Sequence, residues 1–261
     1  MQPIRRNKKF KLNYSKINNW HQAGAGVSQF FNAMSLFFPA GERYFIRSVR
    51  TYLDESPLFM KGDISAFIGQ EAFHGREHEQ LNEALVDYRF TQLLESALEM
   101  LSVKLPKEVN LAATVSLEHI TSILAQGLLE NIECLVESDP EFRDLWVWHA
   151  LEETEHKAVA FDQYEYVIKS QIKAYVLRSV VLVIATAIFA LAVADRYVGL
   201  LRKNNQLTIA NVAATISWLM FKPGILVKLV PLWFSWFNPM FNPWDHDNYF
   251  ELTKHSRLLN S

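Results

Sequence analysis

Apolar side chains recur at three- and four-residue spacing through most of the chain, which is the period of an amphipathic helix. The first such stretch begins at Val27 and ends near Tyr52, just before Pro57. Pro39 interrupts it, and we expect a kink or a restarted helix there, because proline fits a first helical turn and disturbs an interior one. No segment shows the two-residue alternation of a half-buried strand. The pattern therefore predicts an all-α protein.

Four more helical stretches follow the first one. They cover residues 64–86, 90–103, 108–137 and 141 to beyond 166. Asp63 stands before the first of these stretches as an N-cap, and Asp139 with Pro140 separates the last two.

The pattern changes near residue 170, after which long apolar stretches replace the amphipathic ones. Residues 180–194 include no charged side chain, and a second apolar stretch at 207–221 precedes an aromatic run. We therefore divide the chain into a basic N-terminal arm (1–26), a helical bundle (27–170) and an apolar helical extension (171–261). The extension is expected to pack on the bundle or to associate with a membrane.

Ionisable side chains stand on the apolar face of the predicted helix 64–86. Glu71, His74 and His78 are spaced by three and four residues, so they share one helical face. That face also carries Phe67 before them and Leu81 after them. One Glu-x-x-His pair is common on solvated helices, but dinuclear sites in helical bundles use two such pairs on facing helices.

The helix that begins near residue 141 repeats the arrangement with His149, Glu153 and His156. The two other main helices each offer one carboxylate among apolar neighbours, Glu42 and Glu118. An unpaired carboxylate is costly to bury, so each of these needs a cation or a strong donor. Two metal ions would satisfy all of them together. The predicted metal ligands are Glu42, Glu71, His74, Glu118, Glu153 and His156.

The separations along the chain fit a bundle. Glu42 and Glu71 are 29 residues apart, and Glu118 and Glu153 are 35 apart, as expected for antiparallel helices that meet at mid-height. The central gap of 47 residues fits the single long crossover of ferritin-like bundles. We therefore predict an all-α, ferritin-like four-helix bundle with a dinuclear metal site and a C-terminal apolar helical extension.

Several neighbouring residues leave alternatives open. His149 is in phase with the ligands and is a candidate seventh ligand. His78, one turn from His74, is either a further ligand or a residue that supports one. His119 points about 100° away from Glu118 and is expected to be a packing residue. Four glutamates are expected to form solvated flanks or to support a ligating histidine: Glu77, Glu79, Glu152 and Glu155.

A family resemblance is carried by four segments, PAGERYF, FIGQEAFHGREHEQLN, LEHITS and WHALEETEHKAVAFD. They resemble a bacterial family of predicted metal-dependent hydrolases, from about residue 27 to the C-terminus. The motif set is also similar to that of ferritin-like di-iron proteins, especially the arylamine N-oxygenases. Their fourth helix reads His-x-x-x-Glu-x-x-His, which His149, Glu153 and His156 match, while Glu71 and His74 match the preceding Glu-x-x-His. Little else resembles the oxygenases, so their substrate is not carried over.

Carboxylates and imidazoles suit iron or manganese better than a thiolate-preferring metal. We expect two metal ions, with iron favoured and manganese or zinc as alternatives. The favoured function is a di-metal oxidoreductase or oxygenase that uses dioxygen to oxidise an apolar or lipid-like small molecule. The alternative is a metal-dependent hydrolase that uses a metal-activated bridging water. Metal storage is a third, less favoured reading.

Charge and cysteine content bear on partners and compartment. A net charge of −2 indicates no nucleic-acid partner. The single cysteine, Cys134, cannot form an internal disulfide, and the basic N-terminus is followed by no apolar run, so we expect a cytoplasmic protein without a signal peptide.

The extension suggests where the protein acts in the cell. Residues 171–237 include seven basic residues and one acid, with tryptophans nearby, a combination that favours an anionic membrane surface at the inner face of the membrane. The uncharged run of 16 residues between Arg178 and Asp195 falls short of the roughly 20 that span a bilayer. A hairpin buried against the bundle and a homodimer interface are the alternatives.

Overall fold

The computed structural model describes residues 3–85, 88–246, 248, 250 and 252–254, and within these ranges it has helices and no strand. This confirms the predicted all-α class. The α-helices are α1 (Ala25–Ser35), α2 (Phe38–Thr51), α3 (Leu58–Leu85), α4 (Tyr88–Lys104), α5 (Lys107–Leu129), α6 (Pro140–His156), α7 (Val159–Val167), α8 (Gln171–Lys203), α9 (Ile209–Met220) and α10 (Ile225–Ser235), with 3-10 turns at Tyr14–Lys16, Ile132–Cys134 and Pro243–Asp245.

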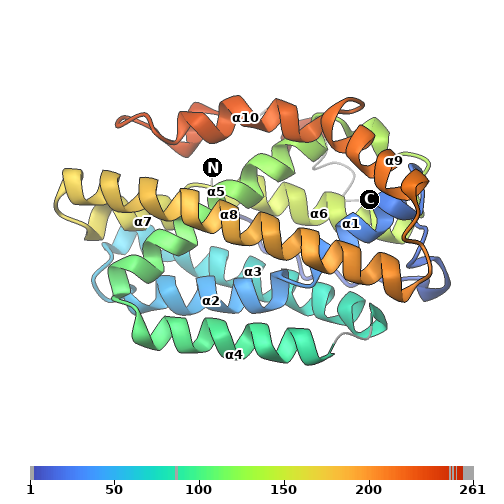
Figure 1. Ribbon diagram of the computed structural model, residues 1–261. Coiled ribbons are helices and arrows are strands. Elements are labelled where there is room, and N and C mark those ends of the chain that lie inside the picture. Colours follow the sequence, from blue (N-terminus) through green and yellow to red (C-terminus); the bar gives the residue numbers. More distant parts are fainter. Residues whose placement is uncertain (1–2, 86–87, 247, 249, 251, 255–261) are drawn as a thin grey trace.

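Four helices form the bundle. They are α2, α3, α5 and α6. Because α2 and α6 each pack against both α3 and α5, the four helices enclose one shared core. Helix α4 lies along the outer side of α2 and fills the long crossover from α3 to α5 (Figure 1). The helical bundle predicted from ligand spacing is therefore confirmed.

Several helix boundaries differ from the prediction. Helix α2 starts anew with Pro39 in its first turn, so the restart is confirmed over the kink. Helix α3 begins at Leu58, directly after Pro57, which leaves the predicted N-cap Asp63 inside the helix. Helix α5 ends eight residues before the predicted 137, where a 3-10 turn takes over. The predicted end at Val86 lies outside the described residues.

The start of α6 follows from its sequence. The Asp139 side chain accepts a hydrogen bond from the backbone N–H of Glu141 at 3.2 Å, and Pro140 occupies the first turn. Both features favour a helix start at this point. The helix then runs unbroken to His156, and two residues separate it from α7 instead of the continuous helix predicted.

The N-terminal arm was expected to be polar and basic, but it packs against the bundle. Phe10 and Trp20 are among its buried side chains. The Arg6 guanidinium bonds the Glu155 carboxylate at 2.6 Å and lies 3.3 Å from Glu152. Two causes act together: carboxylates buried on α6 need a cation, and Phe10 and Trp20 join the apolar core.

Helices α8, α9 and α10 form an outer layer. Helix α8 crosses the bundle against α1 and α5, while α9 lies on α1 and α10 on α5 (Figure 1). By length and composition α8 could cross a membrane: its most apolar 18 residues have a mean hydropathy of 2.5 and are 17% buried. The expectation that this segment is too short was therefore wrong, because the helix extends well beyond the uncharged run. The division into arm, bundle and extension stays a prediction.

Candidate metal centre

The bundle brings all seven predicted ligand residues to its centre, and each is at most 4% exposed. Helix α2 supplies Glu42, α3 supplies Glu71 and His74, α5 supplies Glu118, and α6 supplies His149, Glu153 and His156. Because i, i+3 and i+4 positions share a helical face, each helix points its donors inward while its other faces contact neighbours.

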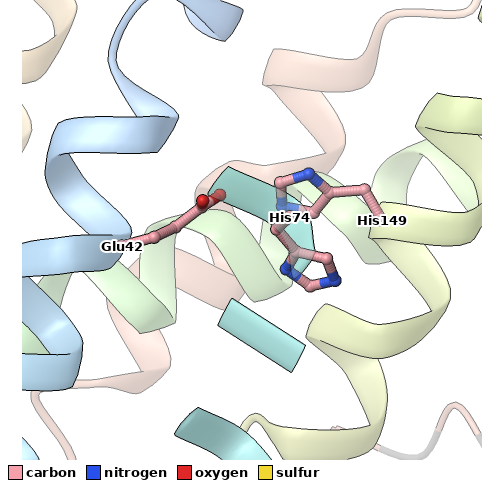
Figure 2. A group of neighbouring side chains, drawn as sticks. All are labelled: Glu42, His74 and His149. Carbon is pink, nitrogen blue, oxygen red and sulfur yellow. The ribbon is translucent and has the colours of Figure 1, made fainter. Parts of the chain in front are cut away.

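A first cluster consists of Glu42, His74 and His149. One ligand atom from each lies within 4.8 Å of the others. The Glu42 side chain extends from α2 toward the two imidazoles, which come from α3 and α6 (Figure 2). The two rings stack with their centroids 4.2 Å apart. One oxygen and two nitrogens thus converge on a space that suits one ion.

A second cluster consists of Glu71, Glu153 and His156, again within 4.8 Å of one another. His156 Nε2 lies 3.2 Å from Glu71 Oε1 and 3.5 Å from Glu153 Oε1. Glu118 belongs to neither group of three, but its Oε2 lies 3.4 Å from the same Nε2 atom. Glu118 therefore adds a carboxylate to the second cluster.

Glu153 connects the two clusters. Its Oε1 atom lies 3.1 Å from His149 Nε2 and 3.5 Å from His74 Nδ1, in addition to its contact with His156. A carboxylate shared in this way could contact two adjacent ions at once. The seven side chains therefore form one continuous site.

The donors in this site lack other partners. Among the described residues, no group donates a hydrogen bond to the carboxylates of Glu42, Glu71 and Glu118, and His74 Nδ1 and His156 Nε2 are also unpaired. Buried charges without partners cost several kcal/mol each. With Glu153 there are four carboxylates, whose charge two divalent cations would balance. The residues present thus fit a dinuclear metal centre of oxygen and nitrogen donors.

The pKa values indicate the same shortage of positive charge. Burial, with the nearby Glu153 charge, raises the pKa of Glu118 to about 7. Burial also raises the pKa of Glu42 and Glu71 well above the usual value. For His74 burial lowers the pKa, but the Glu152 hydrogen bond and neighbouring carboxylates outweigh it and raise the pKa to about 10. The raised pKa values favour the protonated forms of these groups, so protons supply the positive charge that metal ions would otherwise supply.

Two histidines are oriented by hydrogen bonds from outside the site. Gln70 uses its amide nitrogen on Ile4 and Glu155, so its carbonyl oxygen accepts from His156 Nδ1 at 3.0 Å. The Glu152 carboxylate accepts from His74 Nε2 at 3.1 Å. In both rings the other nitrogen faces the carboxylates, and it is the nitrogen available to bind a metal ion. Such partners fix the tautomer of a metal-ligating histidine.

The third histidine is oriented by a chain of side chains. Asn82 donates to the Ser35 carbonyl and accepts from the Ser35 hydroxyl at 2.8 Å. The hydroxyl oxygen must then accept from His78 Nδ1 at 2.8 Å, so His78 Nε2 accepts from His149 Nδ1 at 2.7 Å. This leaves the lone pair of His149 Nε2 directed toward Glu153. Burial lowers the pKa of both imidazoles, to about 4 for His149, which keeps them neutral.

Other candidate residues take different places. His78 belongs to neither cluster and supports His149, the second of its two predicted roles. His119 stacks on Trp236 at 4.6 Å, as expected of a packing residue. Glu79 is a solvated flank, whereas Glu77, Glu152 and Glu155 are buried. Glu152 takes the alternative role predicted for it, because it supports the imidazole of His74. The arm covers all three buried carboxylates, and the sequence pattern does not show where the arm lies.

Three supporting residues were not predicted from the sequence, namely Gln70, Ser35 and Asn82. A signal existed for Asn82, which continues the four-residue spacing of His74 and His78. No comparable signal marks Gln70 or Ser35, because both act on histidines of other helices.

Gly75 allows α2 to approach the site closely. A Cβ atom at this position would lie 2.9 Å from Glu42 Oε2 and 3.8 Å from the Pro39 Cα. The nearest atom is the end of a flexible side chain, so a methyl group would displace the carboxylate before it displaced the helix. The absence of a side chain at residue 75 is thus part of the metal site.

A family model described as "Predicted metal-dependent hydrolase" matches residues 4–247. No curated protein and no solved structure matches the chain significantly. The family description contradicts the expectation of a dioxygen-dependent oxidoreductase or oxygenase and agrees with the hydrolase alternative. The resemblance to arylamine N-oxygenases had rested on a ligand spacing that does not specify how the metals are used.

Removing two of the four carboxylates should abolish metal binding. The paired change Glu71→Ala and Glu153→Ala removes the carboxylate of each Glu-x-x-His motif, and with Glu153 it also removes the link between the two clusters. We expect no retained metal when the purified protein is analysed by plasma mass spectrometry. The exposed Glu79→Ala on α3 is the matched control and should keep two ions per chain. Two ions retained in the double variant would falsify the site.

A methyl group at Gly75 should weaken metal binding without unfolding the protein. We expect Gly75→Ala to lower the affinity for one of two ions by roughly ten- to a hundred-fold, as for other changes that disturb a metal ligand. Competition with a chelator measures this affinity. Gly62→Ala, on the same helix with no atom within 4 Å, is the control. Equal affinities in both variants would contradict the role assigned to Gly75.

Without metal, the site should lose stability as pH rises. The unfolded Glu118 carboxyl ionises near 4.5 and the folded one near 7, so ionisation in this window opposes folding. In chelator, the unfolding free energy of Glu118→Gln relative to the parent should therefore increase from pH 4.5 to pH 8, by on the order of 3 kcal/mol. Urea unfolding at both pH values measures this, with Glu79→Gln as control. An equal difference at both pH values would contradict the prediction.

Proposed function

Because the chain belongs to the family of predicted metal-dependent hydrolases, we propose that its buried clusters hold two divalent cations for the hydrolysis of a carboxyl ester. The observation that carries this proposal is access to the donors. His149 and Glu153 line a pocket of about 60 Å³ whose other walls are almost entirely apolar. A small reacting group can therefore reach the donors, while little bulk water can accompany it.

The chain's own residues hold and orient the donors. The Glu42 cluster would hold one ion and the Glu71 cluster the other, with Glu153 between them. Glu152 and Gln70 keep two imidazole lone pairs directed inward, and His78 does the same for His149. Two bound cations lower the pKa of a water molecule and polarise a carbonyl group.

The reaction balances without an added oxidant or reductant. The hydroxyl of water is joined to the acyl carbon, the acyl C–O bond breaks, and the proton of water goes to the departing alcohol. No redox change is required of the metal, unlike in the oxygenase reading.

We propose iron as the metal, with manganese and zinc as the alternatives that metal analysis distinguishes. The donors are carboxylate oxygens and imidazole nitrogens, which suit these ions, and Cys134 belongs to neither cluster.

Ester hydrolysis should proceed equally well with and without dioxygen. We expect anaerobic and aerobic rates to agree, and oxygen-18 from labelled water to enter the carboxylic acid product, measured by mass spectrometry. Chelation, or Glu153→Ala, should reduce the rate to background, and Glu79→Ala should not change it. Turnover that requires dioxygen, or no hydrolysis of any ester by protein with two bound ions, would contradict the proposal.

A further inference from the structure

An apolar groove adjoins the pocket at the metal centre. The groove has a volume of about 510 Å³ and lies among α1, α5, α8, α9 and α10. The pocket and the groove share part of their lining, which consists of Phe30, Met34, Leu124 and Leu219. The volume of the groove is within the range of small-molecule sites, roughly 300–1,000 Å³. A ligand seated in it could therefore reach His149 and Glu153 past this shared wall.

The polar side chains that line the groove are already occupied. Trp233 Nε1 donates to Thr186 Oγ1 at 2.9 Å, and Thr186 donates to the Leu182 carbonyl. Tyr197 donates its hydroxyl to Thr215 Oγ1 at 2.8 Å. Because these groups bond one another and the backbone, the groove offers a ligand almost nothing except apolar contact. Hydrocarbon fits such a surface, whereas a polar ligand would lose its hydrogen bonds to water.

The pocket beside the groove is small, and its wall includes the metal-site donors His149 and Glu153. At about 60 Å³ it is well below the roughly 150 Å³ of a cavity that holds benzene. The pocket therefore suits a compact group whose oxygen atoms reach the metal donors His149 and Glu153.

From a wide apolar groove beside a narrow pocket that ends at the metal donors, we propose that the substrate is the compact ester of one long, unbranched hydrocarbon chain. The chain occupies the groove, and the ester group occupies the pocket beside His149 and Glu153. This inference rests on the proposed hydrolase function and specifies its substrate. For a methyl ester, water supplies hydroxyl to the acyl carbon and a proton to methanol, and the fatty acid is the other product. The headgroup of a diacyl phospholipid is larger than this pocket of about 60 Å³, so it fits less well than a compact ester.

The surface around the groove suits uptake from lipid. Helix α8 exposes Ile188 and Leu191 at 64% and 73%, and α10 exposes Phe234 at 61%. Large exposed apolar surfaces mark sites that contact lipid or protein. Lys222 precedes α10 and Lys228 lies on it; both are exposed, although the Lys228 ammonium bonds Asn131, and both lie within the region that holds seven basic residues and one acid. This charge matches an anionic lipid surface in which a long-chain ester would be dissolved.

Ketones test the groove without any reaction. 2-Heptanone, 2-nonanone and 2-undecanone resemble methyl esters of increasing chain length but cannot be hydrolysed. We expect their affinity, measured by isothermal titration calorimetry, to rise about fourfold per methylene in both metal-loaded and chelator-treated protein. Affinity independent of chain length would overturn the proposal.

Two variants and a control locate the binding site. Leu219→Trp fills the shared wall and should lower the 2-undecanone affinity at least tenfold. Ile216→Trp, at the exposed part of the groove, should affect 2-undecanone more than 2-heptanone and is less prone to disturb folding. Ile209→Trp, on the same helix, lines neither cavity, is 91% exposed and should bind as the parent does. Parent-like binding in both groove variants would overturn the proposal.

Hydrolysis of methyl esters separates this inference from the proposed function. Hydrolysis rates that rise from methyl butyrate to methyl decanoate support both the hydrolase function and the binding of the chain in the groove. Equal rates would overturn binding in the groove but not the hydrolase function. Chain-dependent ketone binding without hydrolysis of any ester supports the groove and overturns the hydrolase. Faster turnover of methyl decanoate in phosphatidylglycerol than in phosphatidylcholine vesicles would identify an anionic membrane as the source. Equal rates in both would identify the free amphiphile.

Discussion

Four carboxylates buried at the centre of one helical bundle are the constraint on which the rest of this structure depends. Glu42, Glu71, Glu118 and Glu153 come from four different helices, and the first three accept no hydrogen bond from the described residues. Repulsion and desolvation would force these helices apart unless protons or cations compensated for them. Two divalent ions compensate most completely, because they match the charge and accept the vacant lone pairs. Metal binding and the stability of the bundle therefore depend on the same four carboxylates.

A second layer of side chains makes this centre specific. Each imidazole has one nitrogen held by a neighbour outside the site, which leaves the other for a ligand role. The carboxylates Glu152 and Glu155 in that layer carry charge of their own, and Arg6 from the N-terminal arm offsets it. The arm is thus tied to the metal site through two shells of contacts. This explains why a basic segment is folded against the bundle instead of extending into solvent.

The outer layer determines what can approach the centre. Helices α8, α9 and α10 cover α1 and α5 but leave an apolar groove next to the donors. Their outward faces stay apolar, which is unfavourable in water and suits contact with lipid. The same ligands on a polar bundle surface would admit water-soluble substrates, so under the proposed function the extension sets the substrate preference more than the metals do. The family description and the ligand set indicate the kind of reaction, whereas the outer layer indicates the kind of substrate that could reach the donors.

The sequence by itself determined the helical class and the inward faces that carry the ligands. Both depend on local properties, namely the helical period and the cost of burying a carboxylate, which Glu71 and His74 display within one turn. Only the tertiary structure decided which imidazole nitrogen faces the site, that His78 supports His149, and that Arg6 covers Glu155. It also placed α8–α10 beside the donors. These features join residues dozens of positions apart, and helical periodicity does not specify contacts between helices.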